Sequence, residues 1–156
     1  MEIRLLGTAG VHATAEVPVA ALEDTAGAVR ERLANTAFES VADVAVCDGE
    51  CLAGLVRLEW LLAAREDVLI RDLMDPDPPV VGPGVDQEVA AWRMVEHGQS
   101  SLAVVDGDGR FLGLIPPNRM LGVLLQEHDE DLARLAGVLH GTEAAREAGV
   151  EPVGRR

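Results

Sequence analysis

The chain contains no lysine and no tyrosine, and it has few aromatic residues or cysteines. Aromatic residues make up only 3% of the 156 positions, so the core must be aliphatic, and a hydrophobic content of 48% is sufficient for one. Two cysteines do not make a disulfide framework. Cys47 and Cys51 flank a predicted turn, and only His12 is near them in sequence. We therefore expect free thiols there, and no zinc site.

Positive charge is also scarce. The chain carries 13 basic residues, all arginine, against 27 acidic residues, which gives a formal net charge of -14. This balance argues against binding to nucleic acid or to anionic lipid, because both require basic side chains against phosphates. It favours cations or a partner with a basic face, and simple solubility is the alternative reading.

Long apolar runs and signatures of catalysis are missing as well. No segment reaches the roughly 18 apolar residues that a membrane span needs, and residues 1–10 do not resemble a signal peptide. No Gly-x-Ser-x-Gly, His-Glu-x-x-His or lysine-containing phosphate loop occurs. We therefore expect a soluble, cytosolic protein that is not an enzyme.

The chain does contain one pattern twice. The copies read VADVAVCDGECLAGLVRLEWLL from Val41 and SSLAVVDGDGRFLGLIPPNRML from Ser100. Each has an apolar run, an Asp-Gly turn, a second apolar run through a glycine, and a helix-like stretch. A helix-like segment opening on an aspartate precedes each copy. The repeat predicts two β-α-β-β-α units that bury faces against each other.

Local signals place the predicted helices. Asp24 and Asp86 are expected N-caps. In the helix after Asp86, Val89, Trp92 and Val95 share one face, and we interpret Trp92 as core packing. The last helix begins at the proline pair 116–117 and keeps its apolar period as far as residue 139. It is too long to belong only to the repeat, which indicates a connector leaving the body.

The two copies resemble a CBS-domain pair, or Bateman module, over about residues 17–125. The segment IRDLMDPDPPVVGPGVDQEVAAWRMVEHGQSSLAVVDGDGRFLGLI is similar to the cytosolic CBS region of MgtE-type magnesium transporters. EHDEDLARLAGV, from Glu127, resembles the helix that follows that region and leads to the membrane domain. The resemblance implies an α+β fold of tandem CBS repeats with pseudo-twofold symmetry, followed by a long connecting helix. The N-terminal helical domain of that family is not evident here.

The expected segments are a lead-in at 1–16, repeat 1 at 17–73, repeat 2 at 74–125, and a connecting helix and tail at 126–156. The resemblance also implies a homodimer and a membrane domain absent from this chain, in the same polypeptide or as a partner. The sequence leaves open whether residue 156 is a natural end.

CBS pairs commonly bind adenine nucleotides through a Ser or Thr and an Asp that follow the last strand of each repeat. Here Arg57 and Trp60 stand at those positions in the first copy, and Pro116 and Arg119 in the second. Neither copy keeps the hydroxyl or the carboxylate, so nucleotide binding is disfavoured. Arg57 and Arg119 remain candidates for a diverged phosphate contact, or for ion pairs with neighbouring carboxylates.

Acidic residues are the stronger candidates for a ligand site. They form two clusters in the sequence: Asp75, Asp77, Asp86 and Glu88, and then Glu127, Asp129, Glu130 and Asp131. Mg²⁺ prefers oxygen ligands and keeps several waters, so one or two carboxylates suffice to hold it. Solvated acidic faces and helix caps are the alternative interpretation for any single residue.

The sequence therefore predicts a regulatory CBS pair of an MgtE-like transporter that senses Mg²⁺ through these clusters and gates transport. A stand-alone CBS pair that binds an adenine nucleotide, or that serves as a dimerisation scaffold, is the alternative. The sequence does not distinguish Mg²⁺ from Mn²⁺, Co²⁺ or Ca²⁺.

Overall fold

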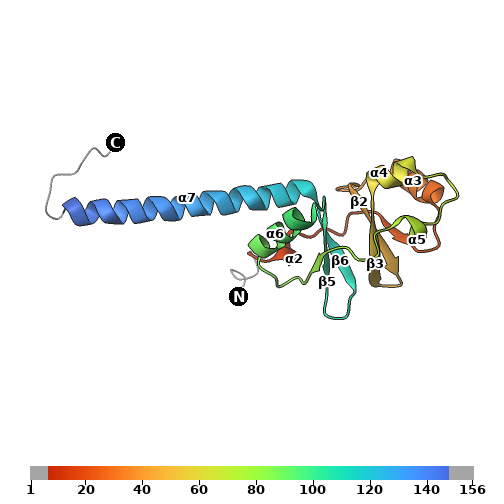
Figure 1. Ribbon diagram of the computed structural model, residues 1–156, viewed down its shortest axis with the longest axis horizontal. Helices are drawn as coiled ribbons and strands as arrows, with labels where there is room; N and C mark the ends of the chain where they lie inside the picture. The colour runs from red at the N-terminus through yellow and green to blue at the C-terminus, as the bar shows by residue number, and fades with distance from the viewer. Residues whose placement is uncertain (1–6, 148–156) are drawn as a thin grey trace.

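The computed structural model describes residues 7–147, which form two similar halves and a long helix that projects from the second half (Figure 1). Each half contains one three-stranded sheet, in the orders β1-β2-β3 and β4-β5-β6. In both sheets the first two strands are parallel, and the last two form an antiparallel hairpin. The α+β fold of paired repeats with a long final helix, predicted from the sequence, is confirmed.

The first half follows the predicted β-α-β-β-α order and adds one short helix, α5, that was not predicted. It comprises β1 (Val19–Ala21), α3 (Ala26–Asn35), β2 (Asp43–Asp48), β3 (Cys51–Arg57), α4 (Leu58–Ala63) and α5 (Ile70–Leu73). The β2–β3 hairpin turns at Gly49, whose φ of 66° lies in the left-handed region that favours glycine. The predicted Asp-Gly turn signal therefore identified the hairpin correctly.

The second half repeats this order with one large difference in helix length. It comprises β4 (Val80–Val81), α6 (Gln87–His97), β5 (Leu102–Val105), β6 (Phe111–Ile115) and α7 (Pro117–Glu147). α7 has 31 residues, against six in α4, its counterpart in the first half. Within the described residues, no helix is both long and apolar enough to cross a membrane.

Two short helices, α2 (Ala9–His12) and α5, lie in the segments that precede the two repeats. Each of them packs on the half of the molecule that does not directly follow it in the sequence. α2 comes before the first repeat but joins the second half, where the Ala9 amide donates to the Val85 carbonyl at 2.7 Å. α5 comes before the second repeat but joins the first half, where the Ile70 amide donates to the Asp24 carbonyl at 2.8 Å. Each linking segment thus ties the two halves together.

The repeated glycines allow these linking segments to approach the last strand of each sheet. Backbone bridges join Leu114 to Thr14 and Leu55 to Asp75. A Cβ added at Gly113 would lie 2.6 Å from the Thr14 carbonyl oxygen, and one at Gly54 would lie closer still to that of Asp75. Only glycine fits at these positions, because the nearest atom in each case is a backbone carbonyl oxygen.

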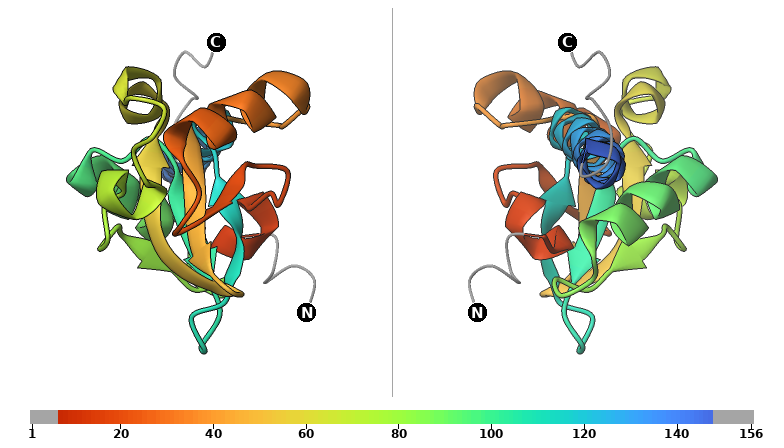
Figure 2. Two further views of the ribbon diagram at one scale, coloured as in Figure 1. Left: turned by 90° about the vertical axis from the view of Figure 1, so that its right-hand side faces the viewer. Right: turned by 90° about the vertical axis from the view of Figure 1, so that its left-hand side faces the viewer.

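Three apolar clusters hold the fold together, and Figure 2 shows the strands of both halves at the centre with helices around them. One cluster lies between sheet and helices in each half, and it includes Val44 and Val46 in the first and Leu102 and Val104 in the second. The third lies between the sheets: Val17, Ala45, Leu55, Ala103, Leu114. Alternate residues of the middle strands therefore face opposite layers.

Two sequence predictions about helices are wrong. α3 is capped by Thr25, whose hydroxyl accepts from the Ala28 amide, and Asp24 instead accepts from the Ala21 amide at 2.9 Å. Trp92 does not pack in the core: 61% of its surface is exposed, and Val89 and Val95 are exposed with it. Small residues, Ala90 and Ala91, occupy the buried face because they let α6 lie close to the sheet.

Candidate functional site

An acidic groove of about 340 Å³ lies between the start of α6 and the middle of α7. Four of the predicted ligand residues line it, two from each helix: Asp86, Glu88, Glu127, Glu130. Gly7, Gln87, Gln126 and Arg134 complete the lining. The fold thus brings together two acidic clusters that are about forty residues apart in the sequence.

The N-terminus of α6 fixes the first pair of carboxylates. Asp86 caps the helix, as predicted, because its Oδ1 accepts from the Glu88 amide at 2.8 Å. Glu88 lies in the first helical turn, where the positive end of the helix favours a negative charge. Both side chains therefore have a local structural role at the edge of the groove.

The second pair of carboxylates, Glu127 and Glu130, comes from α7, and a buried glutamine side chain holds Glu127 in place. Gln87 is only 4% exposed, and its Nε2 donates to Oε2 of Glu127 at 2.6 Å. Its Oε1 lies 2.7 Å from Nε2 of His12 on α2. This His12–Gln87–Glu127 chain links the lead-in, α6 and α7. One turn further along α7, Glu130 lies 3.8 Å from Arg134, so one positive charge offsets part of the acidity.

The groove does not form a cation cage within one chain. Among the side chains described, no three acidic, histidine or cysteine residues converge closely enough to hold a metal ion. The donor set does suit a hydrated divalent cation, since Mg²⁺ keeps several waters and needs one or two carboxylates. It equally suits an ion shared with a second acidic surface.

The other predicted ligand residues lie elsewhere. Asp75 and Asp77 are in the connection before β4, where Oδ1 of Asp75 accepts from the Asp77 amide, and they do not line the groove. Asp129 and Asp131 do not line the groove either, although Asp131 pairs at 2.8 Å with Arg134, which does. The structure therefore brings together four of the eight predicted residues.

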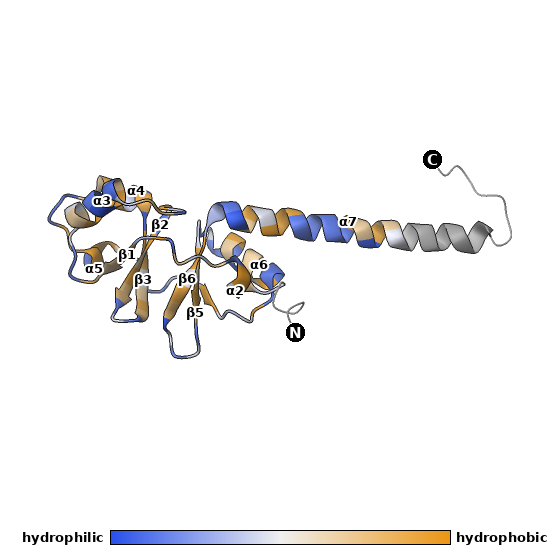
Figure 3. Ribbon diagram, turned by 180° about the vertical axis from the view of Figure 1, so that it is seen from behind, coloured by the Kyte–Doolittle hydropathy of each residue, from blue (hydrophilic) through white to orange (hydrophobic). Residues whose placement is uncertain are grey.

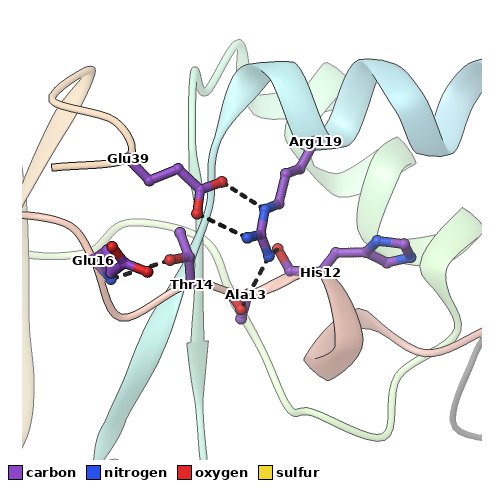
Figure 4. A network of polar contacts seen from close by, with 6 residues as sticks. All are labelled: His12, Ala13, Thr14, Glu16, Glu39 and Arg119. Atoms are coloured by element: carbon purple, nitrogen blue, oxygen red, sulfur yellow. Dashed lines mark hydrogen bonds and ion pairs between the residues drawn. The ribbon is translucent and has the colours of Figure 1, made fainter.

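Arg119 is fully engaged at the position of the diverged nucleotide motif in the second repeat. Its Nε and Nη2 donate to both carboxylate oxygens of Glu39, at 2.6 and 2.7 Å (Figure 4). Nη1 donates to the carbonyls of His12 and Ala13. The guanidinium thus joins three segments, and a phosphate would have to displace Glu39.

Arg57 stands at the hydroxyl position of the motif in the first repeat, whereas Arg119 stands at the carboxylate position in the second, and Arg57 is held more loosely. It donates one bond of 3.2 Å to the Gly98 carbonyl, and its guanidinium lies 5.3 Å from the ring centre of Trp60. This cation–π arrangement leaves most of its donors available. Of the two candidate arginines, Arg57 is therefore the better placed to meet an anion.

A buried polar cluster at the junction of the halves was missed by the sequence analysis. Asp43 is 1% exposed and accepts from the Ser100 hydroxyl at 2.7 Å, while its Oδ1 has no hydrogen-bond partner among the described residues. The Ser101 hydroxyl lies beside the same carboxyl without completing a bond. Burial raises the pKa of Asp43, and the bond from Ser100 partly opposes this. Its place at the start of an apolar strand was the only available signal.

The two cysteines behave as free thiols within the described structure. Cys47 is buried and Cys51 is exposed, on opposite strands of the hairpin turn. Burial raises the pKa of the Cys47 thiol, which disfavours the reactive thiolate. Cys47 therefore does not show the environment of a catalytic nucleophile.

Two apolar grooves occupy equivalent places in the two halves. One, of about 420 Å³, lies between α6 and the start of α7, with Val95, Met120, Leu121 and Leu124 in its lining. The other, of about 280 Å³, lies between α3 and α4 and is lined in part by Leu33, Leu58 and Leu62. Trp92 on α6 and Trp60 on α4 are exposed, but neither of them lines these grooves.

Comparison with known protein families finds a match to the second repeat. Residues 70–126 match the CBS domain. Among curated proteins, the magnesium transporter MgtE of Enterococcus faecalis is 30% identical over 134 residues, which cover 84% of this chain and 30% of that transporter. MgtE of Thermus thermophilus is 32% identical over 87 residues, covering 56% and 19%. The chain thus spans less than a third of the length of either relative.

Solved structures extend the similarity to the whole body. The cytosolic domain of the Mg²⁺ channel MgtE in complex with ATP is 28% identical, with a TM-score of 0.70 over 75% of this chain and 48% of that one. CBSX2 in complex with AMP is 26% identical, with a TM-score of 0.65 over 78% of this chain and 98% of that one. The resemblance to a CBS pair of the MgtE type is confirmed.

Proposed function

Because the chain is a CBS-domain pair that resembles the cytosolic region of MgtE-type magnesium transporters, we propose that it is the regulatory part of an MgtE-like transport system. It acts on the cytosolic side of the membrane, catalyses no reaction, and senses Mg²⁺ through its acidic groove. Its output passes along α7 to a membrane domain, in the same polypeptide or in a partner.

The acidic groove is the observation that carries this proposal. Carboxylates from the cap of α6 and from α7 line one 340 Å³ space, so an ion bound there contacts both the body and the output helix. A bound Mg²⁺ favours the conformation in which the two helices hold these carboxylates close together. In its absence the acidic side chains repel one another, and the population shifts toward the separated conformation.

A homodimer is part of the proposal, and the apolar outer face supports it. Val89, Trp92 and Val95 are exposed on α6, and they adjoin the apolar groove that continues onto α7. Exposed apolar patches of this kind are typical of protein–protein contacts. In the dimer, ions shared between the acidic surfaces of two copies close the modules, and without ions the modules move apart.

Thermal unfolding against MgCl₂, with NaCl at matched ionic strength, tests the proposal. A site-bound ion at 100 times its dissociation constant stabilises the folded chain by about 2.7 kcal/mol. We therefore expect the melting temperature to rise and saturate with MgCl₂ only. If both salts raise the melting temperature equally, the groove is an acidic surface whose charges are screened by salt, and it holds no specific Mg²⁺ site.

Two variants assign the effect to the groove. Glu130→Gln removes a carboxylate that lines the groove, and we expect it to weaken the Mg²⁺ response. Asp129→Asn is the matched control, because it removes the same charge from the neighbouring, exposed residue outside the lining. Equal losses in both variants would contradict a site in the groove.

Binding of an adenine nucleotide is the second candidate function, and the relatives solved with ATP and AMP support it. Arg57 is the residue with donors available for a phosphate. Titration calorimetry with ATP and AMP, repeated on Arg57→Ala, tests this function. Saturable binding that the substitution weakens would favour it, and a chain indifferent to both nucleotide and Mg²⁺ would instead be a dimerisation scaffold.

A further inference from the structure

One face of α7 carries a leucine seam that the body does not cover. Leu121, Leu125, His128, Leu132 and Leu135 follow each other at alternating steps of four and three residues, and the sequence continues the pattern at Leu139. Alternating steps of this kind are the heptad pattern of a coiled coil, in which a narrow apolar stripe packs against another helix. We call residues 121, 125, 128, 132 and 135 the seam.

The seam is distinct from the surface of α7 that contacts the body. Met120 and Val123 are buried against the second half, and Glu127 contacts Gln87. The seam lies one residue further along, roughly 100° around the helix. Its four leucines are between 51% and 58% exposed. Figure 1 shows α7 continuing beyond the body as a single rod, and Figure 3 shows apolar segments alternating with polar ones along it.

We propose that the seam pairs with the seam of a second copy of this chain, in a parallel, in-register, two-stranded coiled coil. The seam begins at Leu121, which also lines the apolar groove between α6 and α7. The apolar outer face of α6 is therefore continuous with the seam. A twofold contact through this face directs both output helices the same way, and the proposal rests on the homodimer proposed above.

The charges beside the seam favour the parallel arrangement. In heptad terms, Asp129 and Asp131 take the two positions that flank the seam. In a parallel pair, Asp129 faces Leu124 of the other copy, and Asp131 faces Ala136. In an antiparallel pair centred on His128 and Leu132, each aspartate faces its own counterpart, and such like-charge contacts are unfavourable. Parallel pairing thus avoids the repulsion that this acidic helix would otherwise create.

His128 is the single polar member of the seam, and in a parallel pair it meets its own counterpart. A polar residue at one seam position selects the register at a cost in stability. The short seam alone would pair weakly, but contact between the two bodies holds the helices at a high effective concentration. Formation of the coiled coil therefore depends on the contact between the two bodies. This dependence allows α7 to transmit a change in that contact.

Cysteine cross-linking of the full chain tests the proposal. A disulfide requires Cα atoms within about 7 Å, which in-register seam positions satisfy and outer positions do not. In a Cys51→Ser background, we expect Leu135→Cys to give a reducible covalent dimer under mild oxidation. Ala133→Cys, an exposed position two residues away on another face, is the matched control and should cross-link at least about tenfold more slowly.

A second variant reports on the register. We expect His128→Leu to tighten self-association by about tenfold in sedimentation equilibrium, since it completes the apolar seam. Equal cross-linking at positions 133 and 135 would overturn the proposal. So would preferential cross-linking between His128→Cys and Leu132→Cys chains in a mixture, because that pattern requires antiparallel helices.

These outcomes separate the coiled coil from the sensing function. If the chain sediments as a dimer and its melting temperature responds to Mg²⁺ while position 135 does not cross-link, only the coiled coil is wrong. If position 135 cross-links specifically and Mg²⁺ has no specific effect, the coiled coil stands and the Mg²⁺ sensor falls.

Discussion

The two halves share a sequence pattern and a topology, yet the helix that follows the last strand ends after six residues in one and continues for 31 in the other. The first half ends its repeat within its own core, whereas the second half extends into the solvent and carries the acidic groove. The motif that follows the last strand differs too, because the second half has Arg119, which binds both oxygens of Glu39, and the first half has Arg57 at another position, with one longer bond. The repeat accounts for the fold, and the departures from the repeat account for the candidate functions.

The largest expected loss of stability comes from replacing the feature that the two halves share, namely the glycine in the last strand of each sheet. We expect Gly54→Ala and Gly113→Ala each to cost about 2–3 kcal/mol of unfolding free energy, because the added Cβ meets a backbone carbonyl that cannot shift cheaply. Urea denaturation measures the loss. Gly107→Ala, where a Cβ meets nothing within 4 Å, is the control and should change stability little. Similar losses at all three positions would mean that close approach is not the cause.

A smaller effect should distinguish the two arginines. We expect Arg119→Ala to cost about 1–2 kcal/mol, because it breaks a bidentate, partly buried pair and two bonds to carbonyls. Arg57→Ala should cost less than about 0.5 kcal/mol, because this half-buried side chain makes only one hydrogen bond, which is long and exposed. The two urea midpoints give the comparison directly. Equal costs would mean that Arg57 is as firmly held as Arg119, which would weaken its candidacy for anion binding.

The smallest effect concerns the start of the middle strand, where the first half has Asp43 and the second has Ser101. Because burial raises the pKa of Asp43 in the folded chain, its contribution to stability is complete at low pH and is lost as pH rises through the folded pKa. We therefore expect Asp43→Asn to stabilise the chain at pH 7, where the buried carboxylate is charged. Thermal melts between pH 4 and pH 7 should show this gain shrinking toward acid, and a gain independent of pH would contradict the explanation.

Much of the fold follows from local signals. The turn at Gly49, the cap at Asp86 and the helix start at Pro117 were predicted correctly because each depends on residues within a few positions. The errors share a cause: the burial of a helix face depends on its partner. Trp92 has the spacing of a core residue, but α6 packs through alanines, and its aromatic face remains outside. The division into segments ending at residues 16, 73 and 125 stays a prediction.

The candidate site was predicted only in part. The sequence identified eight acidic residues without indicating which of them meet, and four line one groove. Gln87, which joins Glu127 to His12, gave no sequence signal, because a buried glutamine in an acidic segment resembles any solvated one. The polar cluster at Asp43 was hidden for a similar reason, since its partners at Ser100 and Ser101 come from the other half.

The sequence by itself determined the two repeats, their hairpins and the long final helix, because periodicity, turn residues and caps act over a few neighbouring residues. It also determined the seam of α7, which is a matter of spacing along one helix. Only the tertiary structure decided that α2 joins the second half, that α6 turns its tryptophan outward, and that Asp86 and Glu130 line the same groove. These outcomes depend on which surfaces fit together across the chain, and no local pattern carries that information.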